Sequence, residues 1–195
     1  MRRTICSNQF LKVEEYTLKN KPKRKFYRCV TRRKGVSIIP VLGNELVVER
    51  QYRYNLARTF LEIPGGGAEK QESMQSTAQR ELLEETGFRS AKPKILFAMN
   101  SAPEFLNSNS NYLLCNIVGK AAQTLDPTEI ITVDRITPQT ALALIKSGKI
   151  NNNHSIIGLL YYLFFLAPKR KESTPLKTRP LVAPRRIKPA KLPKP

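Results

Sequence analysis

Short apolar runs separated by turn residues predict that the first third of the chain is built from β-strands. The clearest pair lies at 36–42 and 45–52, and Gly43 and Asn44 between them suit a two-residue hairpin turn. Pro64, followed by three glycines, ends the last strand of this region. By the same pattern we expect further strands at 10–16, 26–30, 59–63, 94–99, 112–118 and 130–133.

The apolar period changes after the glycines and predicts a helix. Met74, Ala78 and Leu82 recur at every fourth residue, so they would form one stripe that packs on the sheet. Ser73 can cap free N–H groups at the start of this helix. Gly87 suits the left-handed conformation that ends it.

The order of the expected elements predicts the fold class. Two more helices are expected at 138–147 and 155–166. Strands come first, then a helix, more strands and two helices. This order predicts an α+β domain, with a mixed β-sheet sandwiched between helices and an N-terminal β-hairpin extension whose turn lies around 20–23.

Positive charge is concentrated at the two ends of the chain. Of the formal net charge of +19, residues 1–34 carry +10, residues 168–195 carry +9, and residues 35–167 are neutral. We therefore expect a basic N-terminal extension (1–34), a neutral domain (35–167) and a basic tail (168–195). The tail holds seven of the fourteen prolines and one acidic residue, so we expect it to be extended and partly polyproline II.

Segregated charge favours a polyanionic partner, with RNA first. The alternative is that the basic ends only increase solubility. The three cysteines have no close spacing and predict neither a disulfide framework nor a zinc site. The longest apolar run, 156–167, is too short to span a membrane, and the start has no apolar signal-peptide core, so we expect a cytoplasmic protein without a membrane partner.

The strongest chemical signal is a group of three glutamates at the end of the first predicted helix. Glu81, Glu84 and Glu85 would span about 100° of one helix face. Like charges at this spacing destabilise a helix, and a hard cation such as Mg²⁺ or Mn²⁺ would relieve the repulsion. The alternative is a solvated acidic face.

The spacing around these glutamates separates the two interpretations. Gly66 is followed by five residues and Glu72, then by seven residues and the run 80–88, Arg-Glu-Leu-Leu-Glu-Glu-Thr-Gly-Phe. This pattern resembles the Nudix box, and every defining position of the box is filled. The resemblance implies an enzyme that uses divalent metals to cleave a nucleoside diphosphate linked to another group.

The resemblance also implies roles for single residues. Glu81 and Glu85 would be the principal metal ligands, with Glu84 supplementary, and the carbonyl of Gly65 or Gly66 would be a further ligand. Gly66 and Gly67 would lie against the substrate. Arg80 and Glu72 would orient the glutamates, or they would form an ordinary surface ion pair, and Gly87 would be a structural support.

Sequence on either side of the box is similar to the ADP-ribose pyrophosphatase branch of the family. The similarity rests on the run 51–53 (Gln-Tyr-Arg), on 61–66 (Leu-Glu-Ile-Pro-Gly-Gly) and on Pro103, sixteen residues after the last glycine of the box. It implies cleavage of ADP-ribose or a related nucleoside diphosphate sugar to AMP and a sugar phosphate. Arg53 and Glu62 would lie near the nucleotide, or would be a sheet-edge charge and a strand-end cap. The branch also implies a homodimer that exchanges N-terminal strands.

The chain departs from that branch after Pro103. The branch usually has a glycine-rich loop with a glutamate that activates water, whereas the segment 104–111 has Glu104 as its only acid. The catalytic base would be Glu104, a glutamate of the box, or absent. Two hypotheses follow: a Nudix hydrolase, or a Nudix-fold RNA-binding protein that its basic ends attach to the ribosome, with weak or no catalysis.

Overall fold

The structure, a computed structural model, describes residues 2–17, 25–31 and 33–168. The turn expected around 20–23 and the tail from 169 onward lie outside the described residues. The strands are β1 (Arg2–Ser7), β2 (Leu11–Thr17), β3 (Lys25–Thr31), β4 (Gly35–Leu42), β5 (Glu45–Arg53), β6 (Arg58–Glu62), β7 (Phe88–Ser90), β8 (Lys94–Asn100), β9 (Leu106–Asn107), β10 (Asn109–Lys120) and β11 (Ile131–Ile136). The helices are α1 (Met74–Thr86), α2 (Pro138–Lys146) and α3 (Asn153–Tyr161), with a 3₁₀ turn at Tyr54–Leu56 and a π-helical turn at Tyr162–Leu166.

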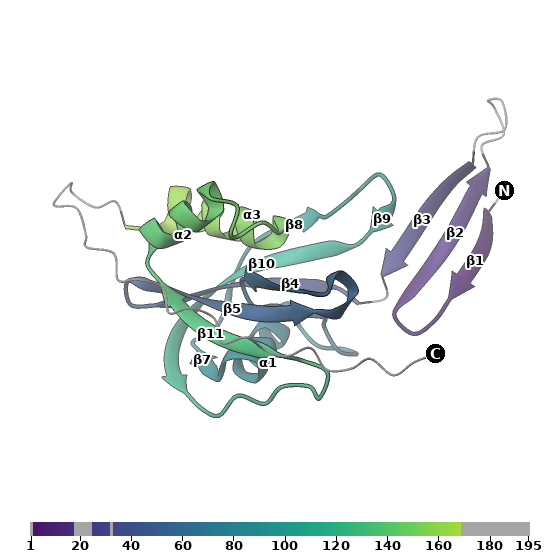
Figure 1. Cartoon of the computed structure of the whole chain (residues 1–195). Helices are drawn as coiled ribbons and strands as arrows, with labels where there is room; N and C mark the ends of the chain where they lie inside the picture. The colour runs from purple at the N-terminus through teal and green to yellow at the C-terminus, as the bar shows by residue number, and fades with distance from the viewer. Residues whose placement is uncertain (1, 18–24, 32, 169–195) are drawn as a thin grey trace.

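The main sheet is mixed and lies between helices, as the sequence predicted. Its strand order is β11-β5-β4-β10-β7, with β6 paired to β5 and β8 paired to β10. β4 and β10 run parallel, and the other pairs are antiparallel. Helix α1 covers one face, and α2 and α3 cover the other (Figure 1). Among the described residues, no helix is long and apolar enough to cross a bilayer.

Two apolar cores hold these layers together. On one face, Ala78 and Leu82 of α1 are fully buried against β4, β5 and β10. On the other, the core joins α2, α3 and the π-helical turn to β4, β5 and β6. Burying one large aliphatic side chain stabilises the fold by about 1.5–3 kcal/mol, so the predicted stripe on α1 is a main attachment of that helix.

Both ends of α1 are fixed as the sequence predicted. The Ser73 hydroxyl accepts a hydrogen bond from the Ser76 N–H. Gly87 has φ of 71°, and its N–H donates to the Leu83 carbonyl at 2.8 Å. A Cβ on Gly87 would lie 2.7 Å from the Ala121 carbonyl oxygen. These two caps set the start and the end of the helix that carries the three glutamates, and the buried Ala78 and Leu82 set which face meets the sheet.

The N-terminal extension is larger than the expected hairpin. β2 and β3 pair as predicted, but β1 adds a third strand and β9 a fourth, in the order β1-β2-β3-β9. This sheet stands beside the main body (Figure 1). β9 comes from the loop after Pro103, and the Cys29 N–H donates to the Phe105 carbonyl at 2.6 Å. The sequence pattern missed β9 because two residues carry no periodic signal.

A buried carboxylate organises the N-terminal sheet. Glu14 is fully buried, and its carboxylate forms ion pairs with Arg2, Lys12 and Arg28 and accepts a hydrogen bond from the Tyr16 hydroxyl. These cations hold the pKa of Glu14 well below its usual range. The ion pairs therefore stabilise the sheet above the ordinary pKa of 4.5, and the stabilisation is lost as the pH falls toward the lowered value.

Glu14→Gln should loosen the N-terminal sheet, because it leaves three cations around a neutral amide. We expect amide hydrogens in β1–β3 to exchange roughly tenfold or more faster, measured by hydrogen exchange with mass spectrometry at neutral pH. The control Glu45→Gln removes an exposed carboxylate that pairs with Arg135 at 3.6 Å, and it should leave exchange in β1–β3 unchanged. Unchanged exchange in Glu14→Gln would contradict this account.

Candidate active site

A cavity of about 650 Å³ opens at the end of the main sheet. This volume lies within the roughly 300–1,000 Å³ of typical small-molecule sites. Its walls come from β4, the β5–β6 turn, the glycine segment, the loop after β8 and the start of α3. The lining residues are Gly35, Val36, Ser37, Arg53, Asn55, Leu56, Phe60, Glu62, Ile63, Pro64, Gly65, Gly66, Ser101, Leu106, Ser108, Asn109, Ser110, Asn152, Asn153 and His154.

Gly65 and Gly66 join this cavity to the carboxylates of α1. A Cβ on Gly65 would overlap the Val36 carbonyl oxygen, and one on Gly66 would overlap the carboxylate of Glu81. The Gly65 N–H donates to Glu85 Oε2 at 2.9 Å. A side chain at position 65 would therefore press on the backbone of β4, and one at position 66 would displace the Glu81 carboxylate.

The sequence left two backbone carbonyls, those of Gly65 and Gly66, as alternative metal ligands. Their hydrogen bonding in the structure differs. The Gly66 carbonyl accepts a hydrogen bond from the Val36 N–H at 2.9 Å. Among the described residues, no hydrogen-bond donor reaches the Gly65 carbonyl. Gly65 is therefore the better placed of the two to contact a cation.

Arg80 holds the acidic end of the site together. Its guanidinium donates two hydrogen bonds to Glu72, one to Glu84 at 2.9 Å and one to the Gly67 carbonyl at 3.0 Å. It also lies 2.9 Å from Glu81. Arg80 lowers the pKa of Glu72 to about 2. This network links α1 to the glycine segment, and it fits the supporting role predicted for Arg80 and Glu72.

Sequence reasoning missed Glu49, a fourth carboxylate on this side of the sheet. It lies in the middle of β5, directly opposite Glu62 in β6, and is 1% exposed. Burial and the repulsion of neighbouring carboxylates raise the pKa values of both Glu49 and Glu85. The available signal was a charged residue after Val47 and Val48, in a strand that otherwise reads as fully buried.

Oxygen atoms from these carboxylates suit a hard divalent cation in their chemistry. Among the described residues, no three acidic, histidine or cysteine side chains are already gathered closely enough to hold one. The side chains of Glu81 and Glu84 instead contact Arg80. The Glu81 carboxylate lies against Gly66, and Glu85 accepts a hydrogen bond from the Gly65 N–H, so the oxygen donors near this segment are of the kind that suits Mg²⁺ or Mn²⁺.

The structure places the other predicted residues at different distances from the cavity. Arg53 and Glu62 both line it and form an ion pair with each other. Gly67 forms a β-bridge with Gly35 and is not among the lining residues. Glu104 is exposed on the turn before β9, also outside the lining.

A polar group at the base of the cavity was also missed. His154 is the second residue of α3. Its Nδ1 also lies 3.3 Å from the Tyr112 hydroxyl and 3.5 Å from the Ser37 hydroxyl, which contacts the Ser110 hydroxyl at 2.8 Å. Burial lowers the pKa of His154, and the nearby Arg53 lowers it further. The cavity therefore offers neutral hydrogen-bonding groups to a ligand.

Comparison with known proteins gives a family for this arrangement. A family model described as the NUDIX domain matches residues 31–156. The chain is 31% identical over 165 residues to the methanol dehydrogenase activator of Bacillus methanolicus, covering 83% of this chain and 88% of the relative. It is 29% identical over 155 residues to an ADP-ribose pyrophosphatase of Bacillus subtilis, covering 77% and 83%.

A solved structure shows the same fold. The crystal structure of an ADP compounds hydrolase superposes with a TM-score of 0.73 at 22% identity, covering 82% of this chain and 88% of that one. At this identity the likeness concerns the fold, including the mixed sheet and the helices on its two faces.

Gly66→Ala should damage the acidic end of the site without unfolding the protein, because the new Cβ would displace the Glu81 carboxylate. We expect Mn²⁺ affinity, measured by isothermal titration calorimetry, to fall by about tenfold or more. Gly119→Ala is the matched control, since its Cβ would lie 3.9 Å from the nearest atom, in Arg89. Equal Mn²⁺ affinity in both variants would show that the Glu81–Gly66 contact does not matter.

Proposed function

The chain belongs to the Nudix family, and from this premise we propose that it cleaves the pyrophosphate of ADP-ribose or a related nucleoside diphosphate sugar to AMP and a sugar phosphate. The observation that carries the proposal is the glycine segment, because it brings Glu81 and Glu85 to the edge of a cavity of nucleotide size. We assign the reaction to the domain 35–167.

We propose that Glu81, Glu84, Glu85 and the Gly65 carbonyl hold Mg²⁺ or Mn²⁺. Such an ion, when bound, lowers the pKa of water and neutralises charge on the phosphates. The chain's own residues fix the donors in place. The Gly65 N–H orients Glu85. Arg80 hydrogen-bonds Glu72 and Glu84, so it holds both side chains in place and offsets part of their negative charge.

The cavity supplies the remaining contacts to the substrate. Arg53 is the lining residue with a permanent positive charge, and a phosphate oxygen can replace Glu62 as its partner. Neutral hydroxyl and amide groups around His154 then bind the nucleoside or sugar, which have many hydrogen-bonding groups and no charge.

We propose a glutamate of the box as the group that accepts the proton of the attacking water. None of Glu81, Glu85 and Glu104 is among the lining residues. Glu81 and Glu85 nevertheless lie against Gly66 and the Gly65 N–H, which belong to the lining, whereas Glu104 is exposed on the turn before β9. The role of Glu104 remains a prediction.

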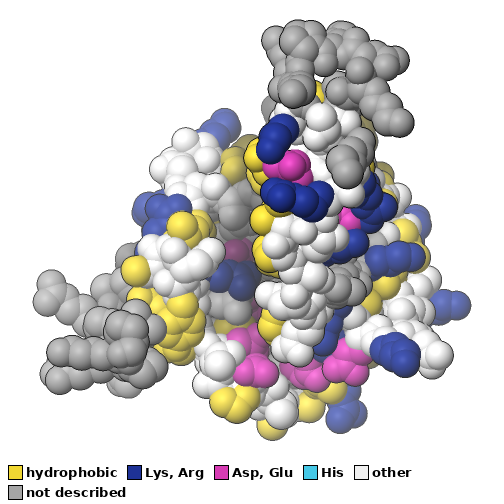
Figure 2. All heavy atoms as spheres, turned by 90° about the vertical axis from the view of Figure 1, so that its right-hand side faces the viewer, with side chains coloured by type: hydrophobic (Ala, Val, Ile, Leu, Met, Phe, Trp, Pro, Cys, Tyr) yellow, Lys and Arg dark blue, Asp and Glu magenta, His cyan; other side chains and the backbone are white. Residues whose placement is uncertain are grey.

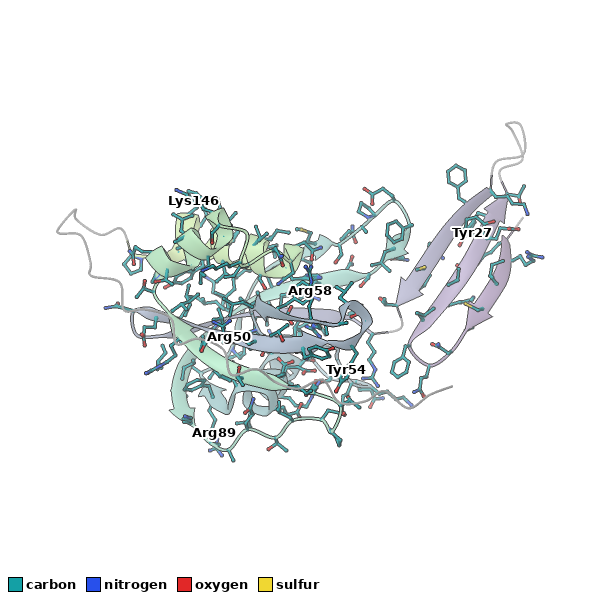
Figure 3. All side chains as sticks on the ribbon, in the orientation of Figure 1. Tyr27, Arg50, Tyr54, Arg58, Arg89 and Lys146 are labelled. Atoms are coloured by element: carbon teal, nitrogen blue, oxygen red, sulfur yellow. The ribbon has the colours of Figure 1, made fainter. Side chains whose placement is uncertain are left out.

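We also propose that the protein is a homodimer whose contact includes the N-terminal sheet. That sheet exposes several large apolar side chains: Ile5, Phe10, Leu11, Phe26 and Tyr27. Tyr27 lies on the N-terminal sheet (Figure 3), where its hydroxyl donates a hydrogen bond to Glu15 Oε2 at 3.2 Å. A small isolated sheet with exposed aromatic residues is stabilised when a second copy covers it.

The RNA hypothesis stays a prediction. Basic side chains are plentiful on the face formed by the N-terminal sheet (Figure 2). However, Arg2, Lys12 and Arg28 neutralise Glu14, and Lys25 pairs with Glu15, so these cations already have protein partners. The tail, which the hypothesis needs most, lies outside the described residues.

Glu85→Gln should abolish most turnover, because it removes a charged ligand and keeps the size of the side chain. With ADP-ribose and Mg²⁺, we expect kcat to fall by about 100-fold or more, measured by chromatography of released AMP. Glu45→Gln, an exposed carboxylate on β5, should behave like wild type. No wild-type turnover on a panel of nucleoside diphosphate sugars, or equal rates in Glu85→Gln, would refute the proposed reaction.

Replacing Phe26 and Tyr27 together by serine should weaken the dimer, because it removes two exposed aromatic side chains from the N-terminal sheet. We expect wild type to sediment at about twice the chain mass of 22.2 kDa and the double variant to shift toward one chain mass. Val118→Ser, which also removes an exposed apolar side chain, is the control and should stay dimeric. A monomeric wild-type protein would refute the dimer.

A further inference from the structure

Glu49 is a buried carboxylate that no described residue hydrogen-bonds, and Arg53, the cation that acts on it, is paired with Glu62. Its side chain is 1% exposed, and neither carboxylate oxygen has a hydrogen-bond partner among the described residues. Burying an ionised carboxylate without a partner costs several kcal/mol, and removing its carboxyl group would avoid that cost. A side chain of this kind indicates a ligand that the protein binds at this place.

The strand geometry directs Glu49 toward the acidic end of the site. Successive residues of β5 point to opposite faces of the sheet. Val47 packs in the core under α1, whereas Leu46 and Val48 pack under α2 and α3. Glu49 therefore points to the α1 face, where Glu85 is 3% exposed and its charge repels that of Glu49.

Nearby cations are already committed to other carboxylates. Arg53 is paired with Glu62, the residue opposite Glu49 in β6. Arg80 contacts Glu72, Glu81 and Glu84. The space between β5 and α1 thus holds two buried carboxyl groups, Glu49 and Glu85, without an ion-pair partner within the part of the chain that the structure describes.

We propose that Glu49 is a ligand of the divalent cation, so that the ion is bound between one carboxylate from the sheet, Glu49, and one from α1, Glu85. This assignment rests on the proposed function, in which Glu85 binds the ion, and adds a ligand that lies outside the Nudix box. A doubly charged cation compensates both buried carboxylates at once. Carboxylates from two elements also fix the ion relative to the sheet that forms the cavity wall.

The test is a titration of the full chain with Mn²⁺ in the absence of substrate. The EPR signal of free aqueous Mn²⁺ measures how much of the ion is not bound. Glu49→Gln keeps the shape of the side chain and removes its charge. We expect its Mn²⁺ dissociation constant to rise by about tenfold or more, and the stabilisation of the protein by Mn²⁺ in a thermal melt to shrink. The metal-free variant should melt at or above the temperature of metal-free wild type, because it lacks the uncompensated carboxylate.

Two further variants make every outcome decisive. Glu85→Gln is the positive reference, and Glu45→Gln, on the same strand but exposed, is the negative one. Weaker binding in Glu85→Gln with unchanged binding in Glu49→Gln would overturn this inference and leave the proposed function intact. Unchanged binding in both would overturn both.

If Glu49→Gln fails to fold, Glu49→Asp replaces it, because it keeps the charge and shortens the reach of the carboxylate. Weaker Mn²⁺ binding in Glu49→Asp supports the inference, and wild-type binding overturns it.

Discussion

The whole site depends on close contact between the backbone of 65–66 and two neighbours, β4 on one side and α1 on the other. A Cβ on Gly65 would overlap the Val36 carbonyl oxygen, and one on Gly66 would overlap the Glu81 carboxylate, so a side chain at either position would force its neighbour to move. Glu81 and Glu85 of α1 therefore lie directly against Gly66 and Gly65, the two glycines that line the cavity. The caps at Ser73 and Gly87 fix where α1 begins and ends, and the buried Ala78 and Leu82 fix which face of the helix meets the sheet.

The electrostatics of the site follow from that close packing. Carboxylates of Glu49, Glu62, Glu81 and Glu85 are forced into a space that water hardly reaches, and burial raises the pKa of each of them. Arg80 neutralises the outer part of the cluster and Arg53 the part that faces the cavity. The inner part, between β5 and α1, is left without compensation. Burying these carboxyl groups lowers the stability of the fold, and a cation that binds between them regains that stability.

The sequence predicted the features that repeat or that have fixed spacing. The stripe at Met74, Ala78 and Leu82 predicted the buried face of α1, and Ser73 and Gly87 predicted its two ends. It could not predict Glu49 or His154, because their roles arise from residues more than thirty positions away in the chain. Nor could it predict β9, a strand of two residues that exists only because β3 offers it a partner.

That short strand has a consequence for how the cavity is built. Leu106, a cavity residue, pairs with Cys29 of the N-terminal sheet, and the loop after Pro103 is thereby bound to a second body of the protein. Both sheets thus contribute to this cavity wall. The stability of the loop after Pro103 is therefore thermodynamically linked to the stability of the N-terminal sheet. Whatever stabilises the N-terminal sheet also stabilises one wall of the cavity, and removal of the extension would leave that wall without its neighbouring strand.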